Sequence, residues 1–413
     1  MKKIMILGAA SGQIPFIKLC RQYNAEVIVV SPKGDYPGFQ YADQCYFLDT
    51  RDTPAILEAA KKEKITGIAT DQTDVSVPTA AYVAERLGLP GIGYDTALRF
   101  TDKYLMRAAA RDIGVAVPRF ASASGLPEAL AAASKMDFPL MMKPNNSSGS
   151  RGVIKIHAAE ELRASLGKSL SYSADQKVII EEFIEGREYI ADGLALDHKY
   201  INTDIGIKMY FDIPGRYISK MCMFSSAALA RGREELAVLE TNHRLVKGLG
   251  LPFGITHAEY IYSPKNETVY LVEIAARGGG VYLSSDLTPL ACGIDTNRIV
   301  IDYLLNGNTV DIASLPLRDK VSAWRCFALH PGMITKMENT DILEKIPGVY
   351  KACLEPLYIG KKIEPLIDDT RKHGPVLVYG DSREECFGAL QKVEQALNIE
   401  TTDAGNNRHA ILW

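Results

Sequence analysis

Residues 178–188 read Val-Ile-Ile-Glu-Glu-Phe-Ile-Glu-Gly-Arg-Glu, and this stretch decides how the rest of the chain is interpreted. Three apolar β-formers run directly into paired carboxylates, which is typical of a buried strand that ends at a polar cleft. Further on, Glu259 and Glu273 each interrupt a strand-like apolar run. Because two carboxylates in one cleft repel each other, their pairing favours a bound magnesium ion. The alternative is that each glutamate ends a strand and points to solvent, as most charged residues do.

Two lysines precede this stretch in settings that favour phosphate. Thr101 or Asp102 can cap a helix, so Lys103 would lie in the first helical turn, where the helix dipole disfavours a cation and an anionic partner would explain it. Lys143 ends a short apolar strand and precedes the loop 145–152, which is rich in Asn, Ser and Gly. Backbone N–H groups of such a loop can wrap a polyphosphate, with the lysine as a point charge beside it. A solvated lysine and a plain connecting loop are the alternatives, and no Walker sequence is present.

Four elements follow one another along the chain: Lys103, Lys143 with its loop, the stretch 178–188, and the pair Glu259 and Glu273. In this order and with these spacings, they resemble the ATP-grasp superfamily of ligases over nearly the whole chain. The resemblance implies an α/β and α+β protein with a Rossmann-like N-terminal domain, an ATP-grasp fold of two α+β subdomains and a small C-terminal α+β domain. It also implies an enzyme, an ATP-dependent carboxylate-amine ligase. Such a ligase makes an acyl-phosphate from ATP and a carboxylate, couples it to an amine, and releases ADP and phosphate. The implied cofactors are ATP and Mg²⁺, with Mn²⁺ as a substitute.

The resemblance also assigns roles to residues. Glu259 and Glu273 look like the magnesium ligands, and the loop 145–152 looks like a lid over the nucleotide. Arg277 would neutralise charge on the transferring phosphoryl group and, with Lys143, forms the catalytic set. The segment 181–184 looks like the hinge that meets adenine, and Glu188 looks like the ribose ligand. The full set expected to contact the nucleotide is Lys103, Lys143, Ser147, Ser148, Gly149, Gly152, Glu181, Glu182, Phe183, Ile184 and Glu188.

One position departs from the family pattern. The family often ends this stretch with Glu-x-Asn-Pro-Arg, whereas here residues 273–277 read Glu-Ile-Ala-Ala-Arg, with Ala275 at the asparagine position. A side-chain ligand to a second magnesium ion is therefore missing, so water or another residue must replace it, or only one metal is held tightly. The number of metals stays open.

Several further residues are candidates for contact with the substrates. His257 lies two residues before Glu259, so on a strand both side chains share a face. This His-x-Glu resembles the subgroup that makes amide bonds from amino acids, although a packed structural histidine is an equal alternative. Lys208, Arg216 and Lys220 lie in or beside a loop that could bind a substrate carboxylate, or they are simply solvated. Residues 278–280 are three glycines that could donate N–H groups to an oxyanion, or form a turn.

We expect three domains: residues 1–100 as an α/β domain before the grasp, 101–308 as the ATP-grasp domain with its lid at about 114–188, and 309–413 as a C-terminal domain. The first begins with a parallel βαβ unit, and its turn at 8–13 lacks the dinucleotide-binding glycine pattern. We expect Asp71 and Asp74 to cap the helix at 78–87 rather than to bind a ligand. Further helices are expected at 234–249 and 383–397, and strands at 321–329 and 376–379.

Composition excludes several classes of protein. Lysine and arginine total 47 against 50 aspartates and glutamates, giving a net charge of −3 with no long basic run, so nucleic-acid binding is not expected. No apolar stretch approaches the roughly 20 residues of a membrane helix. The positive N-terminus leads into an apolar run too short for a signal peptide. Seven cysteines without a Cys-x-x-Cys pair favour a reduced cytoplasm over zinc or a disulfide framework.

Alternatives within and outside this class remain. A bicarbonate-using carboxylase or a purine-pathway ligase would use the same grasp on other substrates. A nucleotide-binding protein without catalysis would keep the fold, and Ala275 keeps that reading open. The expected partners are ATP and small carboxylate and amine substrates, without nucleic acid or membrane. The resemblance also allows a homodimer.

Overall fold

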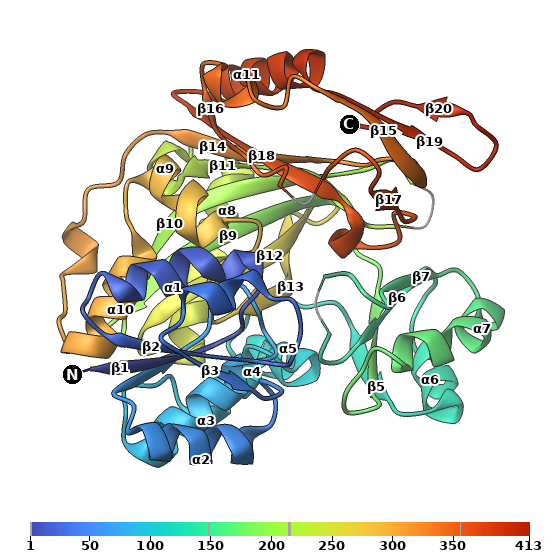
Figure 1. Cartoon of the computed structure of the whole chain (residues 1–413). Helices are drawn as coiled ribbons and strands as arrows, with labels where there is room; N and C mark the ends of the chain where they lie inside the picture. Colours follow the sequence, from blue (N-terminus) through green and yellow to red (C-terminus); the bar gives the residue numbers. More distant parts are fainter. Residues whose placement is uncertain (1, 148, 214–215, 356) are drawn as a thin grey trace.

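The computed structural model describes residues 2–147, 149–213, 216–355 and 357–413. Its strands form four sheets, and Figure 1 shows the N-terminal layer, the lid and the C-terminal layer arranged around the largest sheet. No helix in these ranges is long and apolar enough to cross a membrane.

The N-terminal sheet has four parallel strands in the order β3-β2-β1-β4. Successive residues of β1 face opposite cores, because Ile4 and Ile6 belong to one apolar cluster and Met5 and Leu7 to another. Such burial on both faces is usual for parallel sheets covered by helices. The elements are β1 (Lys3–Leu7), α1 (Ile14–Arg21), β2 (Glu26–Ser31), β3 (Gln44–Phe47), α2 (Thr53–Glu63), β4 (Gly67–Ala69), α3 (Val77–Leu87) and α4 (Tyr94–Arg99).

The lid is an antiparallel sheet of order β5-β8-β6-β7. Two helices pack on it through alanine and leucine side chains and lie beside it in Figure 1. The decisive stretch of sequence forms its inner strand and then crosses to the largest sheet. The lid elements are β5 (Phe120–Ala123), α6 (Leu126–Ala133), β6 (Leu140–Pro144), β7 (Ile154–Ile156), α7 (Ala159–Leu170) and β8 (Val178–Glu182).

The largest sheet has eight strands in the order β13-β12-β9-β10-β11-β14-β18-β16. Its first five strands lie within the expected ATP-grasp domain, and β14, β18 and β16 come from beyond residue 308. Since β11 pairs directly with β14, the expected boundary falls between neighbouring strands of one sheet. The division into three domains stays a prediction. The strands are β9 (Arg187–Leu196), β10 (Lys199–Tyr210), β11 (Ser219–Ser226), β12 (Gly254–Ser263), β13 (Thr268–Ala275), β14 (Val321–Phe327), β16 (Val349–Ala352) and β18 (His373–Gly380).

The remaining elements flank this sheet. A small antiparallel sheet of order β17-β15-β19-β20 and the helix α11 form the C-terminal layer. The predicted helices at 234–249 and 383–397 are confirmed as α8 and α11 to within a residue. These elements are α5 (Lys103–Asp112), α8 (Arg233–Leu249), α9 (Thr288–Cys292), α10 (Thr296–Asn306), β15 (Gly332–Glu338), β17 (Lys362–Ile363), α11 (Arg383–Ala396), β19 (Asn398–Thr402) and β20 (Arg408–His409). Short helices are η1 (Ser11–Gln13), η2 (Pro37–Tyr41), η3 (Ala227–Leu229), η4 (Leu283–Leu287), η5 (Ile312–Ser314), η6 (Leu343–Lys345) and η7 (Asp369–Arg371).

Candidate active site

A cavity lies between the lid sheet and the largest sheet, and the segment 183–186 that connects β8 to β9 forms part of its wall. We call it the grasp cavity. Most of the residues expected to contact a nucleotide or a metal line it, although they come from both sheets and from the start of α5. These lining residues are Lys103, Lys143, Ser147, Gly149, Glu181, Glu182, Phe183, Ile184, Glu188, Glu259 and Glu273.

Three expected residues are placed differently. Ser148 lies outside the described residues. Gly152 is not in the wall of the grasp cavity, and its position is explained by packing: its φ is +72°, and an added Cβ would lie 2.8 Å from Pro144 Cγ and 2.9 Å from Tyr172 Cδ2. Arg277 lines a neighbouring cavity instead.

Lys103 is the first residue of α5, and Asp102 caps this helix by accepting a hydrogen bond from the Leu105 N–H, as expected. The Lys103 ammonium lies 2.8 Å from Glu273 Oε1 and donates to the Ser147 carbonyl at 2.8 Å. The side chain is buried. The predicted phosphate-binding lysine therefore joins the lid loop to a predicted metal ligand.

Lys143 is likewise paired. Its ammonium lies 2.7 Å from one oxygen of Glu181, whose other oxygen lies 2.6 Å from the Nε of Arg107. Burial would raise the pKa of Glu181, but Arg107 and Lys143 together lower it to about 2. The Glu181 side chain is thus enclosed by two cations, and its carboxylate is not directed toward an adenine ring. Within the expected hinge, Ile184 lines the cavity, and no described residue accepts a hydrogen bond from its N–H.

Glu259 and Glu273 stand directly opposite each other on β12 and β13. Lys208 on β10 places its ammonium 2.6 Å from Glu259 Oε1. Although burial raises the pKa of Glu259, Lys208 and then His257 lower it to about 2, so the carboxylate is ionised at neutral pH. Two carboxylates on neighbouring strands are a donor set that suits an oxygen-preferring divalent metal such as Mg²⁺. The pattern of residues therefore fits the expected metal.

Lys208 is a residue whose place in this cavity the sequence did not reveal. We expected it beside a substrate loop, whereas it lines the grasp cavity together with Tyr210, two residues along β10. Despite its burial, the neighbouring acidic groups, Glu259 above all, raise its pKa, so it remains a cation. Tyr210 also donates to Glu188, the expected ribose ligand, and burial raises the pKa of that carboxyl. Side chains two residues apart on a strand point to the same face, so the spacing of Lys208 and Tyr210 on β10 was the signal that could have placed both in one cavity.

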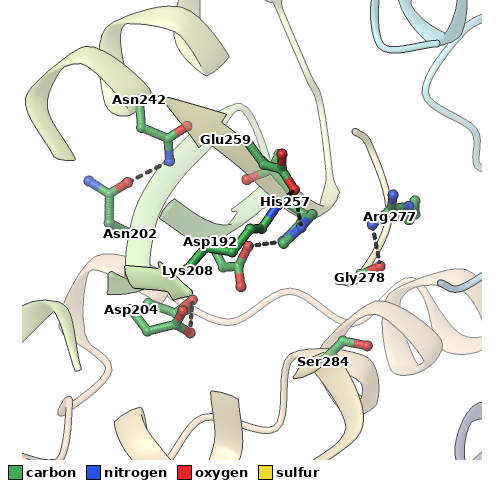
Figure 2. A network of polar contacts seen from close by, with 12 residues as sticks. Asp192, Asn202, Asp204, Lys208, Asn242, His257, Glu259, Arg277, Gly278 and Ser284 are labelled. Carbon is green, nitrogen blue, oxygen red and sulfur yellow. Dashed lines mark hydrogen bonds and ion pairs between the residues drawn. The ribbon is translucent and has the colours of Figure 1, made fainter. Parts of the chain in front are cut away.

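His257 lies between two carboxylates, as Figure 2 shows. Its Nδ1 is 2.7 Å from Asp192 Oδ1, and its Nε2 is 3.9 Å from Glu259 Oε1. Asp192 in turn lies beside Asp204, and burial and then the Asp192 charge raise the pKa of the Asp204 carboxyl. A carboxylate behind an imidazole fixes the orientation of the ring. Asp192 therefore holds His257 with its Nε2 toward the candidate metal ligand, and the role of this histidine stays a prediction.

Arg277 follows β13 and is bound by Asp74, with two contacts of 2.8 Å between the guanidinium and the two carboxylate oxygens. Asp71 accepts hydrogen bonds from the Gly278 N–H at 3.1 Å and the Ser284 hydroxyl at 3.0 Å. The expectation that Asp71 and Asp74 cap a helix is wrong. Ser76 is the N-cap of α3 instead. Both aspartates bind groups in the loop after β13, because the ends of β4 and β13 lie next to each other. Asp74 supplies the counter-charge that the nearly buried Arg277 guanidinium needs.

Comparisons with known proteins agree with this geometry. Residues 136–285 match the family model described as "ATP-grasp domain". The chain is 22% identical to the carbamoyl phosphate synthase large chain of Thermotoga petrophila, over 94% of this chain and 36% of that protein. It thus spans about a third of the length of the curated relatives it matches first.

Solved structures show the same fold. The L-amino acid ligase from Bacillus licheniformis superposes with a TM-score of 0.81 at 20% identity, covering 98% of this chain and 99% of that one. The biotin carboxylase domain of the Hydrogenobacter thermophilus 2-oxoglutarate carboxylase, solved with MgADP and bicarbonate, gives 0.74 at 15% identity over 97% and 91%. Residues 136–285 thus match the ATP-grasp domain and the expected fold class is confirmed, whereas the roles of individual site residues stay predictions.

Proposed function

We propose that this ATP-grasp protein is an ATP-dependent ligase that joins a carboxylate to an amine in an amide bond. One observation carries the proposal: the grasp cavity gathers three lysines and the opposed Glu259 and Glu273 between the lid and the largest sheet. The likeness to an L-amino acid ligase over nearly the whole chain supports an amino-acid substrate. The seven cysteines are all free, which agrees with a proposed cytoplasmic location.

The ion pairs balance the charges of the grasp cavity within the chain itself. Each lysine is held by a carboxylate, so the site carries its charges in neutralised pairs. Glu259 and Glu273 would hold Mg²⁺, which supplies charge neutralisation on the phosphate oxygens when bound. Lys103 and Lys208 would then leave their carboxylates and donate to the phosphates. When such a pair separates, its carboxylate would bind the metal and its lysine would bind phosphate. We therefore expect the metal and the nucleotide to bind together rather than separately.

Transfer of the γ-phosphoryl group would take place at the edge of the grasp cavity. The substrate carboxylate attacks the γ-phosphorus of ATP, the bond to ADP breaks, and the amine then displaces phosphate from the acyl-phosphate. Arg277 would neutralise charge on the oxygens during both steps, and Asp74 fixes its guanidinium plane. His257, oriented by Asp192, would position Glu259 or a phosphate oxygen. The lid loop 145–152 would exclude water from the acyl-phosphate.

The test is magnesium-dependent ADP release by the full chain with amino acids, alone and in pairs, with and without bicarbonate. Release that needs two amino acids supports the proposal. Glu273→Gln and Lys143→Ala should each reduce turnover at least 100-fold in a chain that still folds, although each change removes one partner of an ion pair and lowers the unfolding midpoint. Glu267→Gln, on the exposed turn between β12 and β13, serves as the control and should leave turnover unchanged. Near-normal turnover by Glu273→Gln would refute the assignment.

The same assay distinguishes the other candidates. The likeness to a biotin carboxylase domain that was solved with bicarbonate favours a carboxylating reaction as the second candidate. ADP release that requires bicarbonate and ignores amino acids would move the protein to that class. Nucleotide binding without ADP release under any of these conditions would indicate a binding protein without catalysis.

A further inference from the structure

A second cavity begins at Arg277 and Gly278 and extends between the N-terminal sheet and the largest sheet. We call it the alanine recess. Its walls are the end of β4, helix α3, the start of β12 and helix α10, and they are mostly apolar. Sites at the interface of two layers and at the carboxyl ends of parallel strands are where small molecules usually bind in such folds. Arg277, which we propose to act in the phosphoryl transfer, thus lies in the wall of the recess. Apart from β12, the other walls of the recess come from elements that do not form the grasp cavity.

The recess exists because α3 presents small side chains to it, three alanines and Val77. Ala80, Ala81 and Ala84 line one wall, and Ala81 packs with Ile92 and Ala276, next to Arg277. Protein interiors are packed as densely as organic crystals, so an apolar space of this kind destabilises the folded chain unless something occupies it. A bound apolar group would offset this cost.

One polar group in the wall also lacks a partner. Asn297, at the start of α10, is 2% exposed, and no described residue hydrogen-bonds its amide oxygen. A buried acceptor without a donor is costly, so a ligand that brings an N–H group would satisfy it. Arg277 stands at another part of the wall, with three of its five N–H groups used by Asp74 and Gly278. The recess thus offers a cation, an acceptor and an apolar wall, and it is also lined by the buried Asp71 carboxylate, which accepts from Gly278 and Ser284.

An α-amino acid supplies the complement of all three: a carboxylate for Arg277, an amino group for Asn297 and a side chain for the alanine wall. The free volume of the recess is about 80 Å³. An apolar cavity that binds benzene has about 150 Å³, so this recess suits a branched aliphatic group of three or four carbons better than an aromatic ring. We propose that the alanine recess binds the side chain of a valine-like or leucine-like substrate. This inference rests on the proposed ligase function for its chemical meaning.

Direct binding tests the recess without requiring turnover. Isothermal titration of the full chain with L-valine, L-leucine, L-phenylalanine and glycine should show valine or leucine binding at least 10-fold more tightly than the other two. Ala81→Leu, which fills the recess, should weaken leucine binding at least 10-fold and leave glycine binding unchanged. Ala84→Val fills it less and provides a second variant if Ala81→Leu does not fold, as judged by its thermal unfolding midpoint.

A matched pair on α10 tests the amide. Asn297→Leu removes the unpartnered acceptor in the recess, whereas Thr296→Val removes an unpartnered buried hydroxyl that does not line it. Asn297→Leu should lose leucine binding at least 10-fold and Thr296→Val should retain it.

The outcomes separate this inference from the proposed function. Leucine binding that is unaffected in Ala81→Leu, or no binding of any aliphatic amino acid, overturns the recess even if the protein is a ligase. Leucine binding that Ala81→Leu abolishes, in a protein that never releases ADP, establishes the recess and refutes the ligase.

Discussion

At the scale of single residues, the grasp cavity consists of cations and carboxylates that neutralise one another. Lys103 and Glu273, Lys143 and Glu181, and Lys208 and Glu259 are in contact within 2.8 Å. A paired buried charge is tolerated, whereas an unpaired one is costly. The nucleotide-free protein is therefore stabilised by the groups that would later bind phosphate and metal, so changes to them affect both stability and binding.

Lys208→Met should destabilise the protein by about 2–3 kcal/mol, because Glu259 stays half-buried and loses its nearest cation. Magnesium should restore part of this loss by binding the freed carboxylate. Urea unfolding with and without Mg²⁺ measures both effects. Lys199→Met removes an exposed lysine–carboxylate pair at the start of the same strand and should cost less than about 1 kcal/mol. Equal losses in the two variants would contradict the expected role of Lys208.

Acid should destabilise the protein through Glu181. Its pKa in the folded chain is about 2, whereas an ordinary glutamate titrates near 4.5. The folded state therefore binds fewer protons, so this stabilisation is present above about pH 4.5 and is lost as the pH falls toward 2. It amounts to a few kcal/mol.

Urea unfolding between pH 2 and 6 should show this slope in the wild type and a flatter one in Glu181→Gln. Glu160→Gln, at an exposed position in α7, should keep the wild-type slope. A Glu181→Gln variant with the full wild-type slope would assign the acid sensitivity to other groups.

Sequence reasoning reached some of these residues and missed others for a physical reason. Lys143, Glu181, Glu259 and Glu273 interrupt or end apolar runs, which made them visible before the fold was known. The pairing of each lysine with one carboxylate was not predictable, because it depends on how two sheets face each other. Asp74 and Arg277 are distant in sequence, so local helix-capping rules gave the wrong partner for Asp74.

At the scale of elements, sequence periodicity was a reliable guide. Helices α8 and α11 begin within one residue of the expected positions, and the stretch 178–182 is a strand of the lid as its apolar start predicts. Strand order was not predictable, since β9 pairs with both β10 and β12 although β12 follows much later in the chain.

The turn at the end of the lid loop provides an element-scale prediction. Gly149 and Gly152 both have positive φ, but an added Cβ meets nothing within 4 Å at Gly149 and meets Pro144 and Tyr172 at Gly152. Gly149→Ala should therefore cost only the backbone strain of about 1–2 kcal/mol, and Gly152→Ala should cost more. Urea unfolding of the nucleotide-free variants compares them, and equal losses would show that the loop adjusts to remove the clash.

At the scale of the whole molecule, the N-terminal layer takes part in the site. Asp74 follows β4, Arg277 follows β13, and their bidentate contact joins the N-terminal sheet to the largest sheet. The fold class was predicted through the resemblance carried by the lysines and the strand-end carboxylates, but this contact between layers was not predictable.

Asp74→Asn should keep the shape of this contact but remove its charge, so the Arg277 guanidinium would be less firmly oriented. We expect turnover to fall at least 10-fold while the KM for ATP changes less than 3-fold, because the lysine pairs of the grasp cavity remain. Asp52→Asn, at the N-cap of α2 in the same layer, is the control and should leave turnover near the wild-type value. A KM for ATP that rises as much as turnover falls would place the effect in nucleotide binding instead.

The eight-stranded sheet also has a consequence for biosynthesis. Strand β11 lies inside the sheet only because β14 covers it, and β14, β16 and β18 are made more than 90 residues later in the chain. While the ribosome is still translating, the nascent chain exposes the open edge of β11, which can pair with other chains. Chaperone contact should therefore concentrate on this interval of synthesis, and release from it should coincide with the emergence of residues 321–380.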